Sequence, residues 1–355
     1  MELLDKAGAV RRGEELDAGA VDAFLKRVDG TLAGVPEVSQ FAGGASNLTY
    51  LLRYENRDLI LRRPPFGNRA KGAHDMLREA GIQRALAPVY PCVPAVVATC
   101  DDPAVLGCEF YVMERIKGII PRRDLPKGLA LTPEETRRLC LNVIDKLVEL
   151  HRVDHAAAGL GHLGRGEGYV RRQVEGWQER FRRARTDDVG DFAAVMAWLT
   201  DRMPEGEVAI RVIHNDFRFD NVVLDAADPM RVAGVLDWEM ATLGDPLMDL
   251  GGALAYWVQA DDEPAFLALR RQPTHLPGML TRREVVEYYG ERTGFRVDDF
   301  DFYLVFGLFR LAVIAQQIYQ RYTQGHARDP QFAAFGGVVN TLERRCRGII
   351  DASAP

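Results

Sequence analysis

The pattern of apolar and polar positions divides the chain into a strand-rich first third and a helix-rich remainder. Short runs rich in β-branched and aromatic residues, bounded by turn signals, predict strands at 38–41, 48–54, 57–63, 93–99 and 105–113. Helical spacing predicts a leading helix at about 17–29, capped by Asp17, and one helix at 73–86 among the strands. We therefore expect an α+β chain in which an antiparallel five-stranded sheet carries one helix and precedes a mainly helical part.

Helix signals dominate after residue 117. Two capping boxes are expected to open helices there, Thr132 with Glu135 and Thr281 with Glu284. An arginine-rich helix is expected at 169–185, and a helix at 301–322 is apolar nearly all round although Arg310 stands in its middle. Because a buried guanidinium without a partner is costly, we expect Arg310 to meet either a carboxylate or an anionic ligand.

The segment 212–239 carries the clearest chemistry. An apolar run ends at His214, Asp216 follows two residues later, and Asn221 lies five residues beyond, which is the H-x-D-x-x-x-x-N spacing of a kinase catalytic loop. Two short β-branched runs then flank an Asp-Pro turn and predict a hairpin that brings Asp237 back beside Asn221.

Phosphoryl transfer requires this set of side chains. Mg²⁺ prefers hard oxygen ligands, which the amide of Asn221 and the carboxylate of Asp237 supply. Asp216 is then the carboxylate that accepts the proton of the attacking hydroxyl. The motif G-D-P-L-M-D-L begins a helix at Asp245 and Asp249, and we expect both carboxylates to support the catalytic loop.

These motifs resemble the aminoglycoside phosphotransferase and choline kinase superfamily, and within it the kinase-like domains fused to certain acyl-CoA dehydrogenases. The likeness runs from about Phe41 to the last helix, and its more group-specific parts are G-Y-V-R-R-Q-V-E-G-W at 168–177 and the segment 309–321. The resemblance implies a two-lobed protein-kinase-like fold, with a nucleotide-binding lobe at 1–116 and a catalytic and substrate-binding lobe at 117–355. It also implies ATP and Mg²⁺, with His214 and Asp216 as the catalytic residues.

Other nucleotide-binding residues follow from the same resemblance. Arg62 stands where a kinase strand carries lysine, Arg63 beside it is the alternative, and Glu79 is placed to form an ion pair with Arg62. Backbone at Glu114 and Ile116, before the lobe boundary, is expected to meet adenine. The glycine-containing turn at 42–47 lets backbone N–H groups approach phosphate, and its candidates are Gly43, Gly44, Ser46 and Asn47.

Composition and sequence pattern indicate which classes of partner and which cell compartment to expect. A net charge of −6 gives no basic field for nucleic acid. The apolar segment 302–318 is interrupted by Arg310, which suits a buried helix better than a membrane span. No signal-peptide pattern opens the chain, and the five cysteines lack C-x-x-C spacing, so we expect buried thiols in a cytoplasmic protein.

The function stays open between three hypotheses, of which the first two name different acceptors. The first, implied by the resemblance, is a hydroxyl of a hydroxyacyl-CoA or hydroxy acid, with Arg310, Gln317, Arg321 and Glu239 as candidate contacts. The second is an aminoglycoside or other amino alcohol, for which the acidic clusters at 261–263 and 298–301 are candidates. The third is a pseudokinase scaffold, which the presence of Asp216, Asn221 and Asp237 disfavours. Oligomeric state and the choice between ATP and GTP stay open.

Overall fold

The computed structural model describes residues 4–41, 47–66, 75–327 and 329–353. The chain forms two compact units, one of Met1–Ile120 with Val222–Ala241 and the other of Pro121–Asn221 with Thr242–Pro355. The division into functional lobes at residue 116 stays a prediction. The compact units differ from it chiefly because the segment Val222–Ala241 belongs with the first unit.

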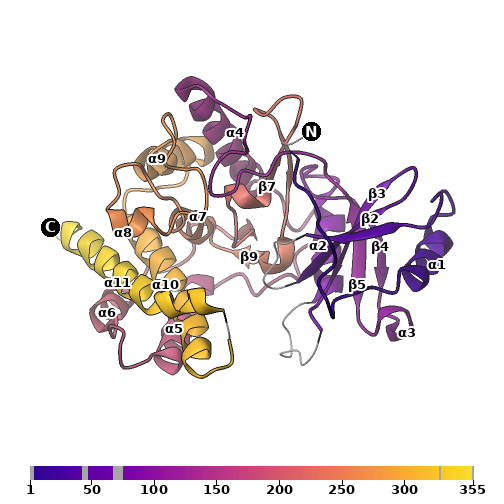
Figure 1. The fold of residues 1–355 in the computed structure, drawn as a ribbon. Coiled ribbons are helices and arrows are strands. Elements are labelled where there is room, and N and C mark those ends of the chain that lie inside the picture. The colour runs from indigo at the N-terminus through magenta and orange to yellow at the C-terminus, as the bar shows by residue number, and fades with distance from the viewer. Residues whose placement is uncertain (1–3, 42–46, 67–74, 328, 354–355) are drawn as a thin grey trace. The chain divides into compact units, whose positions relative to one another are not determined.

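The first unit contains the expected five-stranded antiparallel sheet (Figure 1). Its strand order is β1-β2-β3-β5-β4, and every neighbouring pair is antiparallel. The strands are β1 (Glu37–Gln40), β2 (Leu48–Arg53), β3 (Asp58–Arg63), β4 (Val96–Cys100) and β5 (Phe110–Glu114), and the helices are α1 (Ala18–Val28), α2 (Met76–Leu86) and α3 (Pro103–Leu106). The α+β prediction is confirmed, as is Asp17 as the N-cap of α1.

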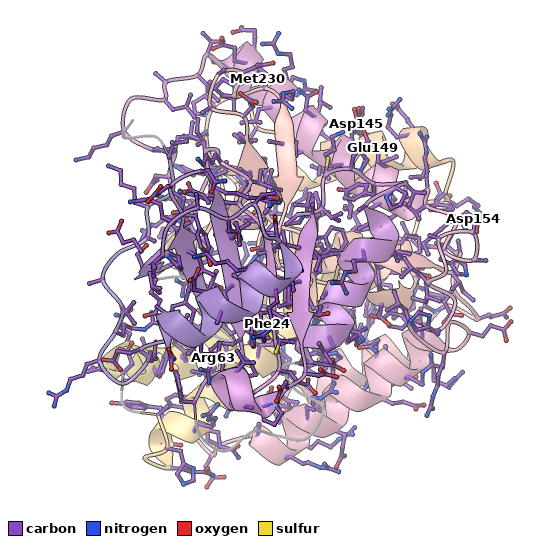
Figure 2. All side chains as sticks on the ribbon, turned by 90° about the vertical axis from the view of Figure 1, so that its right-hand side faces the viewer. Phe24, Arg63, Asp145, Glu149, Asp154 and Met230 are labelled. Atoms are coloured by element: carbon purple, nitrogen blue, oxygen red, sulfur yellow. The ribbon has the colours of Figure 1, made fainter. Side chains whose placement is uncertain are left out.

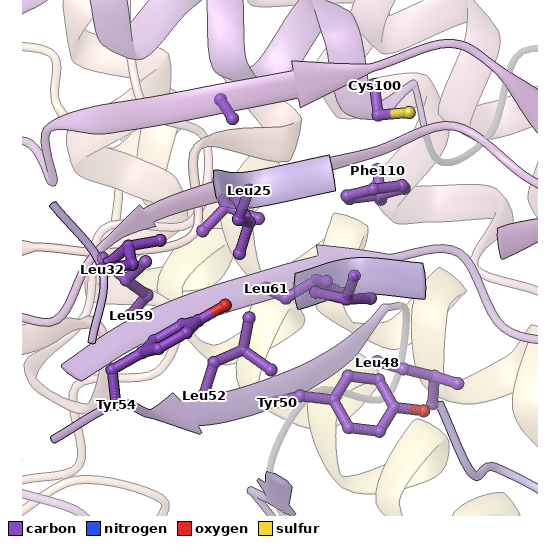
Figure 3. Close-up of a cluster of buried hydrophobic side chains, with 13 residues drawn as sticks. Leu25, Leu32, Leu48, Tyr50, Leu52, Tyr54, Leu59, Leu61, Cys100 and Phe110 are labelled. Atoms are coloured by element: carbon purple, nitrogen blue, oxygen red, sulfur yellow. The ribbon is translucent and has the colours of Figure 1, made fainter. Parts of the chain in front are cut away.

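The sheet is buried on both faces. Tyr50, Leu52 and Leu61 lie on one face in a cluster with Leu25 of α1 (Figure 3). Leu51 and Ile60 lie in a second cluster with Met76 and Ala80 of α2. Each fully buried leucine contributes roughly 1.5–3 kcal/mol relative to an exposed one. Burial on both sides explains why β2 and β3 are nearly continuous apolar runs rather than alternating ones.

One predicted strand begins too early. The segment 105–113 was expected to be extended throughout, but Pro103–Leu106 forms α3 instead. The Asp102 side chain accepts from the N–H of Ala104, and Gly107 ends the helix in the left-handed region at φ +69°. Local capping therefore overrides the β-branched signal of Val105, and β5 starts at Phe110.

The predicted hairpin is present as β7 (Val222–Leu224) and β8 (Val232–Val235). It packs within the first unit, because Leu224 exchanges two backbone hydrogen bonds of 2.8 Å with Ile119. The N–H of Val235 also donates to the carbonyl of Cys92 at 2.7 Å. A short 3-10 turn at Trp238–Met240 follows β8, so Asp237 stands at the end of a well-anchored element.

The second unit is mainly helical, as expected. Both capping boxes are present, at the starts of α4 and α9. Glu149 projects from the exposed face of α4 (Figure 2). The helices are α4 (Pro133–His151), α5 (Tyr169–Ala184), α6 (Ala193–Asp201), α7 (Pro246–Leu254), α8 (Pro264–Leu267), α9 (Arg282–Thr293), α10 (Asp301–Thr323) and α11 (Phe335–Ala352). Two three-residue strands, β6 (Arg211–Ile213) and β9 (Thr242–Gly244), pair antiparallel.

Helix α10 is long and apolar enough to cross a membrane by length and composition, yet 61% of its most apolar window is buried inside the protein. It crosses α7 with backbone against backbone. A Cβ on Gly307 would collide with the carbonyl of Gly251, and a Cβ on Gly251 would collide with that of Tyr303. These features are typical of a core helix. All five cysteines are buried, as expected, and none forms a disulfide.

Candidate active site

The catalytic-loop candidates lie together between β6 and β7. The Nδ2 of Asn221 donates to the carbonyl of Asp216 at 2.8 Å and to its Oδ2 at 3.0 Å. A 3-10 turn at Phe219–Asn221 makes this possible, since it brings a residue five positions later back onto the carboxylate. The amide nitrogen of Asn221 is therefore used on Asp216, and cation binding by its amide oxygen stays a prediction.

Asp249 of α7 holds the start of this loop. Its Oδ2 accepts from the N–H of His214 and its Oδ1 from the N–H of Asn215, both at 2.7 Å. Burial raises the pKa of Asp249, but the hydrogen bond to His151 and the nearby His214 outweigh it and lower the pKa. The expected support of the loop by Asp249 is thus visible as two backbone hydrogen bonds to a carboxylate.

His214 is fully buried in the second unit. Its Nδ1 accepts from the N–H of Asp216 at 3.2 Å, and its ring packs edge-on against Phe217. These contacts suit a residue that shapes the loop, while a direct catalytic role for His214 stays a prediction. Asp245 is the side-chain cap of α7 and also accepts from the N–H of Val208 at 2.8 Å, so it supports the neighbouring chain rather than the loop.

Arg310 meets the catalytic loop through a carbonyl. Its Nη2 donates to the main-chain oxygen of Asn215 at 3.0 Å, and its guanidinium lies 5.5 Å from the ring centre of Trp177. Within the described residues, no carboxylate lies within ion-pair distance of Arg310. Gln317 and Arg321 follow on α10 about two and three turns later, and Arg321 is exposed. Contact of Gln317 and Arg321 with the acceptor stays a prediction.

The phosphate-side candidates lie in the first unit. Arg62 is buried, with its Nη1 3.2 Å from Oε1 of Glu79 and its Nη2 2.9 Å from Oδ1 of Asp237. The predicted Arg62–Glu79 ion pair is therefore present. Arg63 points elsewhere, because its Nε donates to the carbonyl of Pro64 and its guanidinium stacks 3.8 Å from the Phe66 ring centre. Of the two arginines, Arg62 is the one that shares the ion cluster with Asp237.

Burial dominates the electrostatics of that cluster. Glu79 has no exposed surface, and burial together with the nearby Asp237 and Glu239 raises its pKa to about 7 against the lowering effect of Arg62. Glu239 lies 3.7 Å from Arg62, and its Oε2 accepts from Nδ2 of Asn47 at 2.5 Å. Glu239 therefore lies with the phosphate-side residues of the first unit, and its predicted contact with the acceptor stays a prediction.

Arg78 anchors the chain after Asp237. From α2 it donates to the carbonyls of Glu239, at 3.2 Å, and Ala241, at 2.5 Å. Asp237 itself has a left-handed backbone with φ +68°, which is uncommon for a residue with a Cβ. No residue pattern predicts this role of Arg78, because its partners are main-chain atoms more than 160 residues away.

The remaining nucleotide candidates fall into two sets. Gly43, Gly44 and Ser46 lie outside the described residues. Glu114 forms an ion pair with Arg57, and the Ile116 side chain packs where a Cβ on Gly234 of β8 would stand. Adenine binding by the backbone at Glu114 and Ile116 stays a prediction. In the described ranges, no group of three His, Cys, Asp or Glu side chains forms a ready metal site.

One catalytic-loop residue was not predicted. Arg218 lies with its Nη2 3.3 Å from Oδ2 of Asp216 and its Nε 3.1 Å from Oδ1 of Asp220, and its guanidinium lies 4.7 Å from the ring centre of Tyr256. Its position two residues after Asp216 is the sequence feature that could have predicted these contacts.

Solved structures with the same architecture include small-molecule kinases. A protein of Ralstonia eutropha JMP134 that is assigned as an aminoglycoside phosphotransferase is 28% identical, with a TM-score of 0.81 over 96% of this chain and 100% of that one. Choline kinase from Cryptosporidium parvum Iowa II shares the fold at 12% identity, with a TM-score of 0.61 over 94% of this chain and 97% of that one.

Sequence relatives carry acyl-CoA dehydrogenase names. Mouse acyl-CoA dehydrogenase family member 10 is 34% identical over 94% of this chain and 31% of that protein. Chicken acyl-CoA dehydrogenase family member 11 is 32% identical over 95% of this chain and 44% of that protein. The chain thus spans less than half the length of these two relatives. Residues 37–285 match the model of the phosphotransferase enzyme family. The chain therefore belongs to the phosphotransferase enzyme family.

Proposed function

We propose that this phosphotransferase transfers the γ-phosphoryl group of ATP, with Mg²⁺, to a hydroxyl of a small anionic molecule, either a hydroxyacyl-CoA or a free hydroxy acid. The observation that carries the proposal is the pairing of Asp216 with Asn221 at 3.0 Å in a loop held by Asp249. A positioned carboxylate of this kind can accept the proton of the acceptor hydroxyl as the phosphoryl group is transferred.

The residues proposed for Mg²⁺ have suitable chemistry. Asn221 uses its amide nitrogen on Asp216, so its oxygen can face a cation, and Asp237 supplies a carboxylate in the first unit. Magnesium keeps several waters and takes the remaining ligands from nucleotide phosphates, so two protein oxygens are sufficient. When bound, Mg²⁺ would neutralise phosphate charge.

The protein's own residues would act on the nucleotide in two ways. Arg62, held in the first unit by Glu79, would bind phosphate oxygens through its planar guanidinium. The segment proposed from the sequence to supply backbone N–H groups, the glycines before Asn47, lies outside the described residues. Because Asn221 and Val222 are consecutive, the catalytic loop continues directly into the hairpin that ends at Asp237.

An anionic acceptor is supported by two observations. Arg310 donates to the residue before Asp216 and has no carboxylate partner within the described part of the chain, so its positive charge is not neutralised by a neighbouring side chain. The similarity to proteins named acyl-CoA dehydrogenase family members supports an acyl-CoA among such acceptors. A cytoplasmic location is part of the proposal and is supported by five buried cysteines, none of which forms a disulfide.

The alternative of a cationic amino-alcohol acceptor receives less support, because the acidic clusters are already engaged. Asp262 pairs with Arg282 and Arg345, each at 2.6 Å, and Asp298 pairs with Arg296 at 3.4 Å. The cluster at 298–301 borders a cavity of about 720 Å³, whose lining also contains Arg202 and Arg296 but no catalytic-loop residue.

The test is a nucleotide-consumption screen with Mg²⁺ and the native protein. The acceptors are hydroxyacyl-CoAs that differ in hydroxyl position, the matching free hydroxy acids, choline and aminoglycosides, and the control enzyme is Asp216→Asn. The proposal expects consumption with a hydroxyacyl compound that is lost in the control. Faster consumption with an aminoglycoside or choline would overturn the anionic acceptor.

A further inference from the structure

Asn215, the residue directly before Asp216, has a left-handed backbone with φ +64°. Left-handed values are uncommon for residues with a Cβ, although asparagine tolerates them better than most. Such a conformation persists only where the surroundings hold it in place. The direction in which the Asp216 side chain leaves the backbone depends on it, since the two residues share a peptide bond.

Three helices contact three of the four polar groups of Asn215. The phenol of Tyr169, on α5, donates to its Oδ1 at 3.1 Å. The guanidinium of Arg310, on α10, donates to its carbonyl at 3.0 Å, and its N–H donates to Asp249 of α7 at 2.7 Å. These contacts are separated by 46, 95 and 34 residues in sequence, so they exist only in the folded protein.

Glycines leave the space that the Tyr169 and Arg310 side chains occupy. A Cβ on Gly244 would lie 2.9 Å from the Tyr169 ring, and a Cβ on Gly252 would lie 3.2 Å from Nη1 of Arg310. Burial raises the pKa of Tyr169 to about 12, so its phenol stays protonated and able to donate at any working pH. Tyr169 is almost fully buried, with 6% of its surface exposed, so it is not a solvent-facing side chain.

We propose that Tyr169 is a positioning residue that acts through Asn215, fixing the left-handed backbone there and with it the orientation of the Asp216 carboxylate. The inference rests on the proposed function of Asp216 as the base. One part of the inference does not depend on that function: Tyr169 also restricts the conformational freedom of residues 212–221. A positioning residue of this kind affects the transition state more than ground-state binding, so its loss lowers kcat while leaving KM nearly unchanged.

The experiment compares Tyr169→Phe, Asn215→Gly and the double variant, all in the full chain. Tyr169→Phe keeps the ring that packs on Gly244 and removes only the donor. Asn215→Gly keeps the left-handed backbone accessible but removes the acceptor. Tyr288→Phe is the matched control, because its phenol also donates to a side chain, Asp145 at 2.8 Å, and does not contact the loop.

Two readouts are measured. The first is kcat and KM for ATP and for the best hydroxyacyl acceptor of the screen; kcat of Tyr169→Phe is expected to fall roughly tenfold, with each KM within about twofold. The second is hydrogen–deuterium exchange of peptides covering 212–221 without substrates, which is expected to be about threefold or more faster in Tyr169→Phe. The control is expected to match the native protein in both.

The double variant decides whether Tyr169 acts through Asn215. If it does, Asn215→Gly already removes the interaction, and adding Tyr169→Phe changes kcat no further. Multiplicative effects, or native kcat and native exchange in Tyr169→Phe, would overturn the inference. If the Tyr169→Phe protein does not fold, Asn215→Gly tests the inference by itself. A native kcat in Asn215→Gly would then overturn the inference. A fully active Asp216→Asn would instead overturn the proposed function, and the exchange data would still test the loop.

Discussion

Nη2 of Arg62 lies 2.9 Å from Oδ1 of Asp237, which joins a sheet residue to the carboxylate proposed for Mg²⁺. The same guanidinium lies 3.2 Å from Glu79 of α2. One buried arginine thus fixes a strand, a helix and the end of the β7–β8 hairpin within the first unit. Because a guanidinium fork fits carboxylate and phosphate oxygens equally well, the residue that organises this cluster is also the one proposed to bind the nucleotide phosphates.

A first prediction separates Arg62 from its neighbour Arg63. Arg62→Lys keeps the charge but loses the planar fork, so we expect KM for ATP to rise roughly tenfold or more. Arg63→Lys is the matched control, because within the described residues the Arg63 guanidinium contacts a carbonyl and an aromatic ring and no carboxylate, and KM for ATP should stay near the native value. Equal effects in steady-state assays would contradict the assignment of Arg62.

A second prediction concerns Asp237. If Asp237 is a Mg²⁺ ligand, Asp237→Ala should abolish the Mg²⁺ dependence of ATP binding measured by isothermal calorimetry. Glu239→Gln is the comparison, since Glu239 lies in the same cluster, 3.7 Å from Arg62, and is not proposed as a metal ligand. An Asp237→Ala protein that melts at lower temperature but keeps the native Mg²⁺ dependence would show a structural role only.

A third prediction uses the pH dependence of stability. Burial raises the pKa of Asp245 from its ordinary value of 3.8 to about 6. The folded state then binds a proton more tightly than the unfolded state. This contribution is fully present below about pH 4 and is lost as the pH rises through about 6, and the shift corresponds to about 3 kcal/mol.

Asp245→Asn removes this titration. Urea unfolding should therefore show the native protein losing roughly 2 kcal/mol or somewhat more relative to the variant between pH 4 and pH 7. The asparagine also changes the cap of α7, which shifts the whole curve without changing its pH slope. Parallel curves for the two proteins over this range would show that the pKa of Asp245 is not raised.

A fourth prediction concerns the acceptor. Arg310→Met should raise KM for a hydroxyacyl acceptor roughly tenfold more than KM for ATP, because the proposed anion contact involves the acceptor alone. Some loss of kcat is also expected, since Arg310 donates to the carbonyl of Asn215. Arg292→Met on the surface of α9 controls for loss of an arginine, and equal rises of both KM values would contradict an acceptor role.

The sequence predicted those parts of the fold that have local signals. The strands, the β7–β8 hairpin and the two capping boxes depend on residues a few positions apart, and all were found. The α3 helix was missed, because one Asp102 cap outweighed the β-branched pattern after it. The three-residue strands β6 and β9 were missed because three residues carry no periodicity.

In the candidate site, too, contacts between residues close in sequence were predicted and contacts between distant residues were missed. Asp216 and Asn221 were predicted together because they are five residues apart, and the structure joins them directly. The contacts of Asn215 with Tyr169 and Arg310 were not predicted, although both partners lie in segments that had been singled out as group-specific. Hydrogen bonds to main-chain atoms leave no residue-type signal at the acceptor, so pattern alone cannot pair them.

The most direct measurement is product analysis with native protein and Asp216→Asn. Each is incubated with Mg²⁺, ATP and the best hydroxyacyl acceptor, and the acceptor is examined by mass spectrometry and phosphorus NMR. The native protein should yield an acceptor carrying one phosphoryl ester at its hydroxyl, and Asp216→Asn should form it roughly 10²- to 10⁴-fold more slowly while binding ATP normally. A phosphorylated product formed at the native rate by Asp216→Asn, or no phosphorylated hydroxyacyl compound from the native protein, would contradict the proposed reaction.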